Sequence, residues 1–252
     1  SILNQNPDVY ASPSSPLFPM LTKASEAFKL PQNVDYNRDS GISAVVNNIA
    51  NNFYSDHEQK YIIDKNHWWP IPVGVGLIER FITKNIKIIC PVRDVVEVLA
   101  SFNTIIEKNI YLNKNNSIDE GALKFTHPDK PMADRRANFL MMPNQDIATH
   151  LFGMGHAKEP QFRHLFHFVE YNDFVSDPQK VINGIYDYLE IDRFEHTFDN
   201  LKTEVPAKSI TNIHDLHKVN PKVEKRSVDP KDIFLEETIR RYSGLEFWRE
   251  LK

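Results

Sequence analysis

The strongest pattern of apolar and polar positions lies in residues 86–106. The β-branched run Ile86–Ile89 predicts a central strand that is covered on both faces. Asp94 follows it in a position where a carboxylate would cap the start of a helix. The apolar residues after Asp94 recur at a spacing near 3.6, as on the buried face of a helix. They are Val95, Val98, Leu99, Phe102 and Ile106.

A second strand and two helices are predicted upstream. The strand is Tyr61–Asp64, and the helices run from Ile42 to Phe53, with Ser40 as a candidate cap, and from Val73 to Thr83 after Pro72. The later helix connects the two strands, which gives a βαβ unit whose strands are expected to be parallel.

The second half of the chain also predicts regular elements. Helices are expected from Ala133 to Met142, from Gln179 to Leu189 and from Pro230 to Leu251, and a strand from His164 to Glu170. The closing helix is assigned to packing through five apolar anchors. They are Ile233, Leu235, Ile239, Tyr242 and Trp248.

Three segments are predicted to be irregular. The first thirty residues are rich in proline, which implies an irregular stretch after a short helix. Asn109–Pro131 is polar and is expected to be a mobile excursion or lid. Pro143–Pro160 contains Gly153 and Gly155 and is typical of a loop.

Composition is that of an ordinary globular protein. Of the 252 residues, 41% are apolar and 25% are charged, and this length suits one large α/β domain with a substantial core. The net charge of −4 provides no electrostatic footprint for nucleic acid. No apolar run reaches the roughly 18 residues of a membrane span, and no secretory leader is visible. A cytoplasmic protein is therefore expected.

Cysteine and histidine argue against metal chemistry. The single cysteine, Cys90, excludes an internal disulfide framework and a cysteine zinc cluster. Because Cys90 lies in the apolar strand, a buried small hydrophobe is preferred over a reactive thiol. His164 and His167 would face opposite sides of a strand, and no HExxH spacing occurs. No metal site is expected.

The candidate chemistry lies at the end of the central strand. Arg93 stands where open α/β sheets bind ligands, and Ser101 follows eight residues later on the polar edge of the predicted helix, beside Asp94 and Glu97. A guanidinium and a hydroxyl together suit a phosphate monoester. The alternative is a surface ion pair between Arg93 and Asp94 or Glu97, with an ordinary helical serine.

Four segments together carry a resemblance to a known family. The Arg93 segment resembles the 3′-phosphate-binding motif of the sulfotransferases, which holds the 3′-phosphate of 3′-phosphoadenosine 5′-phosphosulfate (PAPS). Tyr61–His67 is similar to the strand that ends in Lys-Thr-His in cytosolic sulfotransferases, and Phe168–Pro178 to the family's Tyr-Glu-Asp-Leu segment. Ser1–Val9 resembles the helix and turn after the family's 5′-phosphosulfate loop. That loop, Pro-Arg/Lys-Ser-Gly-Ser/Thr-Thr, does not occur in the 252 residues, so the chain is expected to begin just past it.

The resemblance implies roles for several side chains. Lys65 would stabilise charge on the leaving phosphate, and His67 would take the proton of the acceptor. A second interpretation of His67 stays open, in which its ring stacks beside Trp68 and Trp69 and orients rather than reacts. These tryptophans, with Phe18, suit an aromatic wall for an acceptor, but packing explains them equally well.

Binding residues for the donor are implied further along the chain. Tyr171 would lie near the adenine. The basic segment 213–227 is similar to late loops of the family that fold over the 3′-phosphate or the sulfate. Within it, Arg226 is the favoured contact because its planar guanidinium suits phosphate, followed by Ser227. A solvated charged loop explains this segment equally well.

The resemblance also implies the fold and the activity. The fold would be α/β, of the P-loop-containing nucleotide-hydrolase-like kind, with helices flanking a central parallel β-sheet. Residues 1–252 would form a single domain that lacks its first strand and phosphosulfate loop. The expected activity is transfer of a sulfuryl group from PAPS to a hydroxyl or amine of a small-molecule, carbohydrate or peptide acceptor. The product would be 3′-phosphoadenosine 5′-phosphate (PAP), with no metal and no nucleic acid involved.

Two other functions stay open. A non-catalytic binding protein that kept the fold is one, because residues 11–15 lack the catalytic Glu that tyrosylprotein sulfotransferases carry at the corresponding position. A P-loop kinase is the other, although the GxxxxGK[ST] stretch that it requires cannot be identified.

Overall fold

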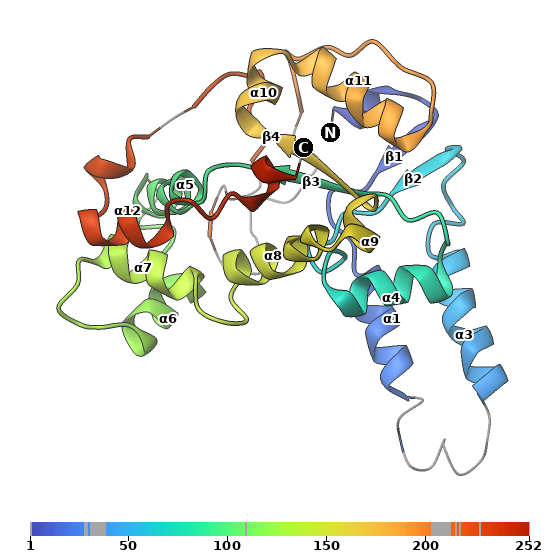
Figure 1. Ribbon diagram of the computed structural model, residues 1–252, viewed down its shortest axis with the longest axis horizontal. Helices are drawn as coiled ribbons and strands as arrows, with labels where there is room; N and C mark the ends of the chain where they lie inside the picture. Colours follow the sequence, from blue (N-terminus) through green and yellow to red (C-terminus); the bar gives the residue numbers. More distant parts are fainter. Residues whose placement is uncertain are drawn as a thin grey trace. The chain divides into compact units, whose positions relative to one another are not determined.

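A computed structural model gives the fold of the chain (Figure 1). It describes residues 2–27, 30, 39–108, 110–202, 213, 214, 216, 218–226 and 228–251. The chain divides into two compact units, Ser1–Ile88 and Ile89–Lys252, and each is described by itself.

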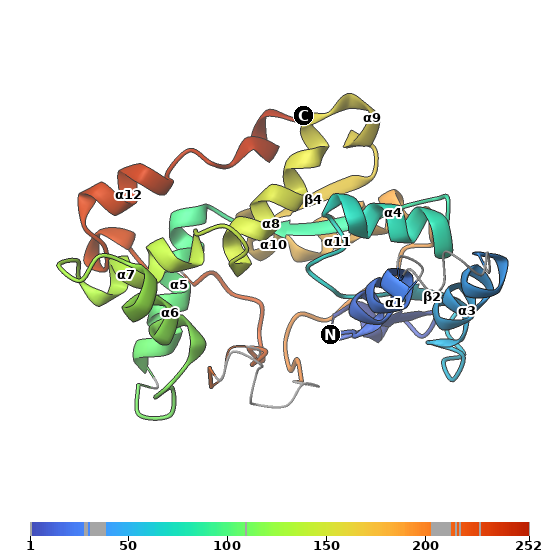
Figure 2. The same cartoon turned by 90° about the horizontal axis from the view of Figure 1, so that it is seen from below.

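In its described residues, the first unit combines a small parallel sheet with three α-helices. Strands β1 (Val9–Ala11) and β2 (Tyr61–Ile63) pair in parallel, with Val9 opposite Tyr61 and Ala11 opposite Ile63. Helices α1 and α3 lie side by side, and α4 packs against both (Figures 1 and 2). These elements, with a short 3-10 helix, are η1 (Leu3–Gln5), α1 (Leu17–Glu26), α3 (Asp39–Asn52) and α4 (Pro72–Phe81).

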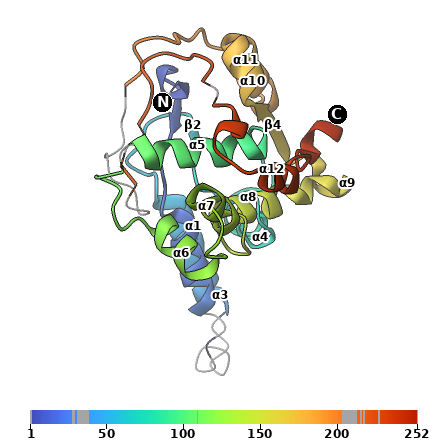
Figure 3. The same cartoon turned by 90° about the vertical axis from the view of Figure 1, so that its left-hand side faces the viewer.

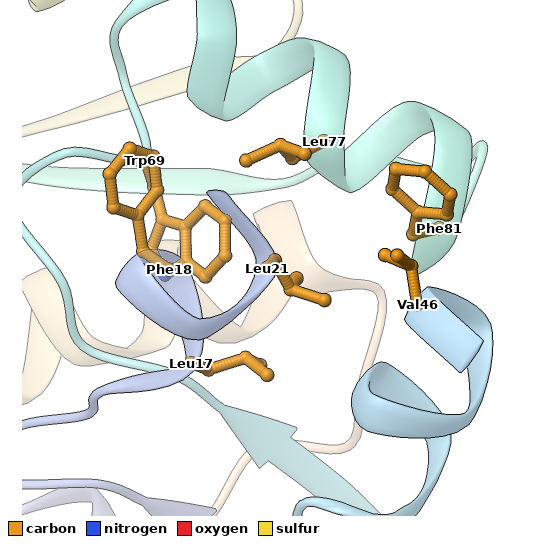
Figure 4. Packing of buried hydrophobic residues seen from close by; sticks show 7 residues of the cluster. All are labelled: Leu17, Phe18, Leu21, Val46, Trp69, Leu77 and Phe81. Carbon is orange, nitrogen blue, oxygen red and sulfur yellow. The ribbon is translucent and has the colours of Figure 1, made fainter. Parts of the chain in front are cut away.

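The core of this unit lies between the three helices. Figure 4 shows the apolar side chains of α1 and α4 facing a shared space with one residue of α3 and one tryptophan. Each such side chain contributes on the order of 1.5–3 kcal/mol when it is fully buried. The cluster is Leu17, Phe18, Leu21, Val46, Trp69, Leu77 and Phe81.

The expectation of an irregular first thirty residues was wrong. Helix α1 begins at Leu17, directly after Pro16, and contains Pro19 in its first turn. Proline has no N–H to donate, and the first turn of a helix does not need one. The prolines therefore mark the start of a helix here, and β1 precedes it.

The part of the second unit that the structure describes has one strand pair and a larger set of helices. Strand β3 (Ile88–Val92) is hydrogen-bonded to β4 (Phe166–Glu170). Helices α6 and α7 are neighbours, and α7 also packs against α5 (Figure 3). The helices are α5 (Val95–Lys108), α6 (Ser117–Phe125), α7 (Met132–Leu140), α8 (Asp146–Met154), α9 (Pro160–Arg163), α10 (Tyr171–Ser176), α11 (Pro178–Leu189) and α12 (Glu236–Tyr242), with 3-10 helices η3 (Gly155–Lys158), η4 (Pro230–Asp232) and η5 (Phe247–Glu250).

The start of α5 is fixed as the sequence predicted. The Asp94 carboxylate accepts hydrogen bonds from the backbone N–H of Val96 (3.0 Å) and of Glu97 (3.2 Å). Glu246 accepts a third bond from the N–H of Val95 (2.9 Å). Three N–H groups that have no partner within the helix are thereby satisfied.

The buried face of α5 is shifted around the helix from the predicted one. Val95, Leu99 and Ile106 are buried as expected, whereas Val98 and Phe102 are only half-buried. The remaining buried positions of the helix are Val96, Ala100 and Asn103.

A buried arginine joins three helices of this unit. The guanidinium of Arg136, on α7, donates to both carboxylate oxygens of Asp119 on α6 (2.6 and 3.1 Å). It also donates to Asn103 on α5 (2.8 Å) and to Glu107. Arg136 is only 4% exposed, so removal of Asp119 would leave its buried charge with Glu107 as the one remaining carboxylate partner among those described.

Two segments predicted as loops contain helices. Within 109–131, the side chain of Asn116 accepts a hydrogen bond from the N–H of Asp119 (2.9 Å) and caps α6. Within 143–160, α8 ends just before Gly155 and includes Gly153. Gly153 therefore lies in the last turn of α8 and Gly155 directly after it, and neither prevents the helix from forming.

The closing segment is not one helix. Between α12 and η5 the chain turns at Gly244, whose φ of 76° is left-handed and suits glycine. Leu235, expected as an anchor, is 43% exposed, and Phe234 is buried instead. His164 ends α9 rather than beginning a strand.

The sheet prediction holds in its coarse form. The fold is α/β, with short parallel strands and flanking helices. In the described residues, β2 pairs with β1 and β3 with β4, so the pairing expected within one βαβ unit is not among the described ladders. No helix in the described ranges is long and apolar enough to cross a membrane.

Candidate functional site

The second unit brings together three residues that the sequence assigned to the donor. The centre of the Arg93 guanidinium lies 4.2 Å from the centroid of the Tyr171 ring. Its Nη2 donates a hydrogen bond to the backbone carbonyl of Arg226 (2.9 Å). Arg93 follows β3 and Tyr171 begins α10 directly after β4, so the carboxyl ends of these paired strands lie together.

Tyr171 also forms hydrogen bonds with the backbone of Arg226. Its phenol oxygen accepts a hydrogen bond from the N–H of Arg226 (2.9 Å), and its O–H lies 3.3 Å from the Arg226 carbonyl oxygen. The side chain of Arg226 instead donates to the Glu224 carboxylate (2.8 Å). Residue 226 thus meets Arg93 and Tyr171 through its main chain. Ser227 lies outside the described residues.

The polar side chains of α5 extend this group. Arg93 Nε donates to Glu97 Oε2 (2.6 Å), with the two side chains 16% and 30% exposed. This is the ion pair that the alternative interpretation of the sequence expected. Ser101 is four residues beyond Glu97, on the same face of the helix, and is half-buried. Its hydroxyl makes no hydrogen bond in the part of the chain that is described.

The first unit places Lys65 and His67 in a turn after β2. The backbone N–H of Lys65 donates to the hydroxyl of Ser12 (2.8 Å). Asn66 Nδ2 donates to the carbonyl of Ser15 (2.9 Å). The side chains of Lys65 and His67 are exposed, and that of Lys65 forms no ion pair with any described residue. The turn is therefore anchored through its backbone and through Asn66.

A carboxylate beside Lys65 organises the aromatic residues. Asp64 accepts hydrogen bonds from the Tyr54 hydroxyl and from Trp69 Nε1 (2.6 Å). Burial, together with the hydrogen bond to Asp64, raises the pKa of Tyr54 to about 12. Tyr54 therefore stays protonated and remains a donor at neutral pH.

The aromatic residues of this turn divide between core and surface. Phe18 and Trp69 are buried, with ring centroids 5.3 Å apart in an edge-on contact, so packing accounts for both. Trp68 is half-buried, and its ring centroid lies 5.1 Å from that of His67. Only Trp68 and His67 of this group could offer ring surface to a ligand.

The other titratable groups fit structural roles. Burial raises the pKa of Cys90 to about 12, as expected of a thiol inside a strand. Burial lowers the pKa of His167, which stacks on Tyr188 with centroids 4.9 Å apart. No group of three or more His, Cys, Asp or Glu side chains in the described ranges could hold a metal ion.

Sequence reasoning did not single out Ser12, Tyr54 or Asp64 as part of the Lys65 turn. Ser12 and Lys65 are 53 positions apart, and a hydroxyl bonded to a backbone N–H leaves no pattern in a sequence. The one available signal was the position of Asp64, directly after a predicted strand and before the candidate lysine.

Comparison with known proteins assigns the family. The model of the sulfotransferase domain matches residues 56–242, which is most of the chain. The chain belongs to the sulfotransferase domain family. The matched range of this sulfotransferase domain includes Lys65, His67, Arg93, Tyr171 and Arg226.

The chain was also compared with solved structures and with curated proteins. This sulfotransferase domain is similar to a sulfotransferase domain from the curacin biosynthetic pathway, with 17% identity and a TM-score of 0.36. The match covers 69% of this chain and 56% of that chain. No curated protein matches the chain.

Proposed function

We propose that this sulfotransferase domain transfers a sulfuryl group from PAPS to a hydroxyl or amine acceptor and releases PAP. Family membership supports sulfuryl transfer in general. The observation that carries the choice of donor is the meeting of Arg93, Tyr171 and the backbone of residue 226 at the ends of β3 and β4. Residues 1–252 would form a single sulfotransferase-like domain.

Donor binding would use the cation and the ring that already lie together. The Arg93 guanidinium donates to a carboxylate and to a backbone carbonyl, and a 3′-phosphate would offer it a charged acceptor that can take two parallel hydrogen bonds. Ser101, one turn beyond Glu97, would add a hydroxyl donor. The Tyr171 ring would lie near the adenine, and Arg226 and Ser227 would close over the phosphate or the sulfate.

The chemistry assigned to Lys65 and His67 is an in-line transfer. The acceptor oxygen or nitrogen forms a bond to sulfur as the bond between sulfur and the bridging oxygen of the donor breaks. Negative charge grows on that bridging oxygen, so the exposed ammonium of Lys65 would stabilise the transition state more than the ground state. His67 would take the proton that the acceptor loses, because imidazole is the side chain that most often accepts a proton at neutral pH. The scheme needs no metal.

The test is donor binding by the Arg93→Ala variant. Hydrogen bonds to charged groups contribute about 1.5–3 kcal/mol, so the affinity for PAP measured by calorimetry should fall about 10- to 100-fold. Arg93→Lys keeps the charge but not the planar fork, and we expect an intermediate loss. Arg193→Ala is the matched control, because it removes an exposed arginine from a surface ion pair with Asp187.

Three outcomes decide the proposal. Equal PAP affinity in the wild type, Arg93→Ala and Arg193→Ala would remove Arg93 from the donor site. In a direct competition between the two nucleotides for binding to the chain, an affinity for ATP equal to that for PAP would favour the kinase alternative. Sulfate incorporation from labelled PAPS, assayed on hydroxylated sugars, tyrosyl peptides, steroids and phenols, separates an enzyme from a binding protein that has lost its chemistry.

A further inference from the structure

The loop that follows β1 is hydrogen-bonded to the turn that contains Lys65. We propose that Ser12 is a positioning residue, which fixes the backbone of Lys65 and so places its ammonium for the transfer described above. This inference rests on the proposed function, because it assumes that Lys65 acts on the donor.

Ser12 bonds to the second strand on both sides of Asp64. Its backbone N–H donates to the carbonyl of Ile63 (2.9 Å), which extends the parallel ladder by one residue beyond β1. Its side-chain hydroxyl accepts the N–H of Lys65 (2.8 Å). A side-chain oxygen thus takes the place of a backbone acceptor where the ladder ends. Ser12 is only 5% exposed, so water does not replace it easily.

Tyr54 and Asp64 belong to the same set of hydrogen bonds as Ser12. The Asp64 carboxylate is bonded to the Tyr54 hydroxyl and to Trp69 Nε1. The Tyr54 hydroxyl also interacts with the hydroxyl of Ser12. Residues 64 and 65 are therefore fixed in orientation by one connected set of hydrogen bonds within the first unit.

The rest of the turn is tied to the same loop. Asn66 donates to the carbonyl of Ser15 (2.9 Å) and accepts the N–H of Trp68 (3.0 Å). Both bonds constrain the residue between the two candidate catalytic side chains. The loop after β1 accordingly holds the turn after β2 at two successive residues.

A backbone anchor matters here because of what Lys65 lacks. Its ammonium is exposed and forms no ion pair with the described residues, so no such pair fixes the position of the ammonium. Four rotatable bonds separate the ammonium from its Cα, and any displacement of the backbone adds to the range of positions that these bonds allow. A misplacement of about 1 Å can cost a factor of about 100 in rate.

The experiment compares Ser12→Ala with Ser14→Ala in the full chain. Ser14 lies two residues away and is exposed, so its substitution controls for a change of serine in the same loop. We expect Ser12→Ala to lower kcat about 10- to 100-fold, with the KM for PAPS and the affinity for PAP within about twofold of the wild type. Ser14→Ala should match the wild type in all three.

A purely structural role predicts a different result. If Ser12 only satisfies the backbone N–H of Lys65, Ser12→Ala should lower the melting temperature and leave kcat unchanged at temperatures where the variant is folded, which would overturn the proposal. If Ser12→Ala does not fold, Tyr54→Phe removes a single hydroxyl from the same set of bonds. That variant should lower kcat several-fold, and full activity would contradict the positioning role.

Hydrogen exchange at the Lys65 amide gives a readout that is independent of activity. The amide should be protected in the wild type and in Ser14→Ala, and exposed in Ser12→Ala. An unprotected amide in the wild type would refute the anchor while leaving the proposed function intact. A protected amide in a wild-type chain that neither binds PAP nor transfers sulfate would refute the proposed function, and the positioning role with it.

Discussion

The close approach of α4 to the Lys65 turn can be tested with two glycines of one helix. A Cβ added to Gly74 would overlap the carbonyl oxygen of Trp68 and lie 2.6 Å from that of Trp69. It would also lie 2.9 Å from Trp69 Cα. A Cβ added to Gly76 would meet nothing within 4 Å. A glycine-to-alanine substitution therefore meets backbone atoms at position 74 and open space at position 76.

The magnitudes follow from this geometry. Restoring an ordinary contact of 3.4 Å with the Trp69 carbonyl would need a movement of roughly 0.8 Å, and backbone atoms cannot swing aside as a side chain does. Overpacking of this kind costs about 1–3 kcal/mol. Alanine in place of glycine within a helix gains about 0.8–1 kcal/mol. We expect Gly76→Ala to stabilise the first unit by up to about 1 kcal/mol and Gly74→Ala to destabilise it.

The assay is urea unfolding followed by tryptophan fluorescence. Two of the three tryptophans, Trp68 and Trp69, lie in the contact itself. Because both variants gain a similar helix propensity, the difference between their unfolding free energies isolates the steric cost, which should be about 1–3 kcal/mol. Equal stability of Gly74→Ala and Gly76→Ala would show that the approach of α4 to this turn is not as close as described.

Further predictions concern the second unit. Burial lowers the pKa of His167 below its ordinary 6.5, so the unfolded chain binds more protons and stability should fall as pH drops below 6.5. His167→Phe keeps a ring on Tyr188, and its urea midpoint should depend less on pH; an unchanged dependence would contradict this assignment. Cys90, with a pKa of about 12, should not react with a thiol reagent at pH 8 until the chain unfolds, and a rapid reaction would refute its burial. Gly121→Ala should destabilise the packing of α6 on α7 by about 1–3 kcal/mol in chemical unfolding, because the new Cβ would overlap the Phe139 ring; unchanged stability would show that this ring moves aside at no cost.

Local signals in the sequence predicted local structure well. The capping of α5 by Asp94 and the burial of Cys90 were both anticipated, because a cap acts within three residues and an apolar strand buries what it contains. The helix that begins at Pro178 was also predicted within one residue. In each case the deciding interaction lies within one element.

The misses have an equally physical origin. Prolines before α1 and glycines at the end of α8 resemble loop signals until their position in the helix is known. Asn116 is a residue type that often caps a helix, and it caps α6. The polar composition of the residues around it nevertheless favoured a loop in the sequence prediction. The positioning bond from Ser12 to Lys65 joins two loops across 53 positions, and no periodicity records such a contact. The assignment of Arg93 and Tyr171 to one place came from the resemblance to a family.

The contacts of residue 226 with Arg93 and Tyr171 do not involve its side chain. Arg93 and Tyr171 both bind the peptide groups of this residue and not its guanidinium. Nineteen of the twenty standard amino acids supply the same N–H and carbonyl, and proline alone lacks the N–H. The junction with Arg93 and Tyr171 therefore tolerates any residue except proline at position 226, and a comparison of side chains alone would not reveal it.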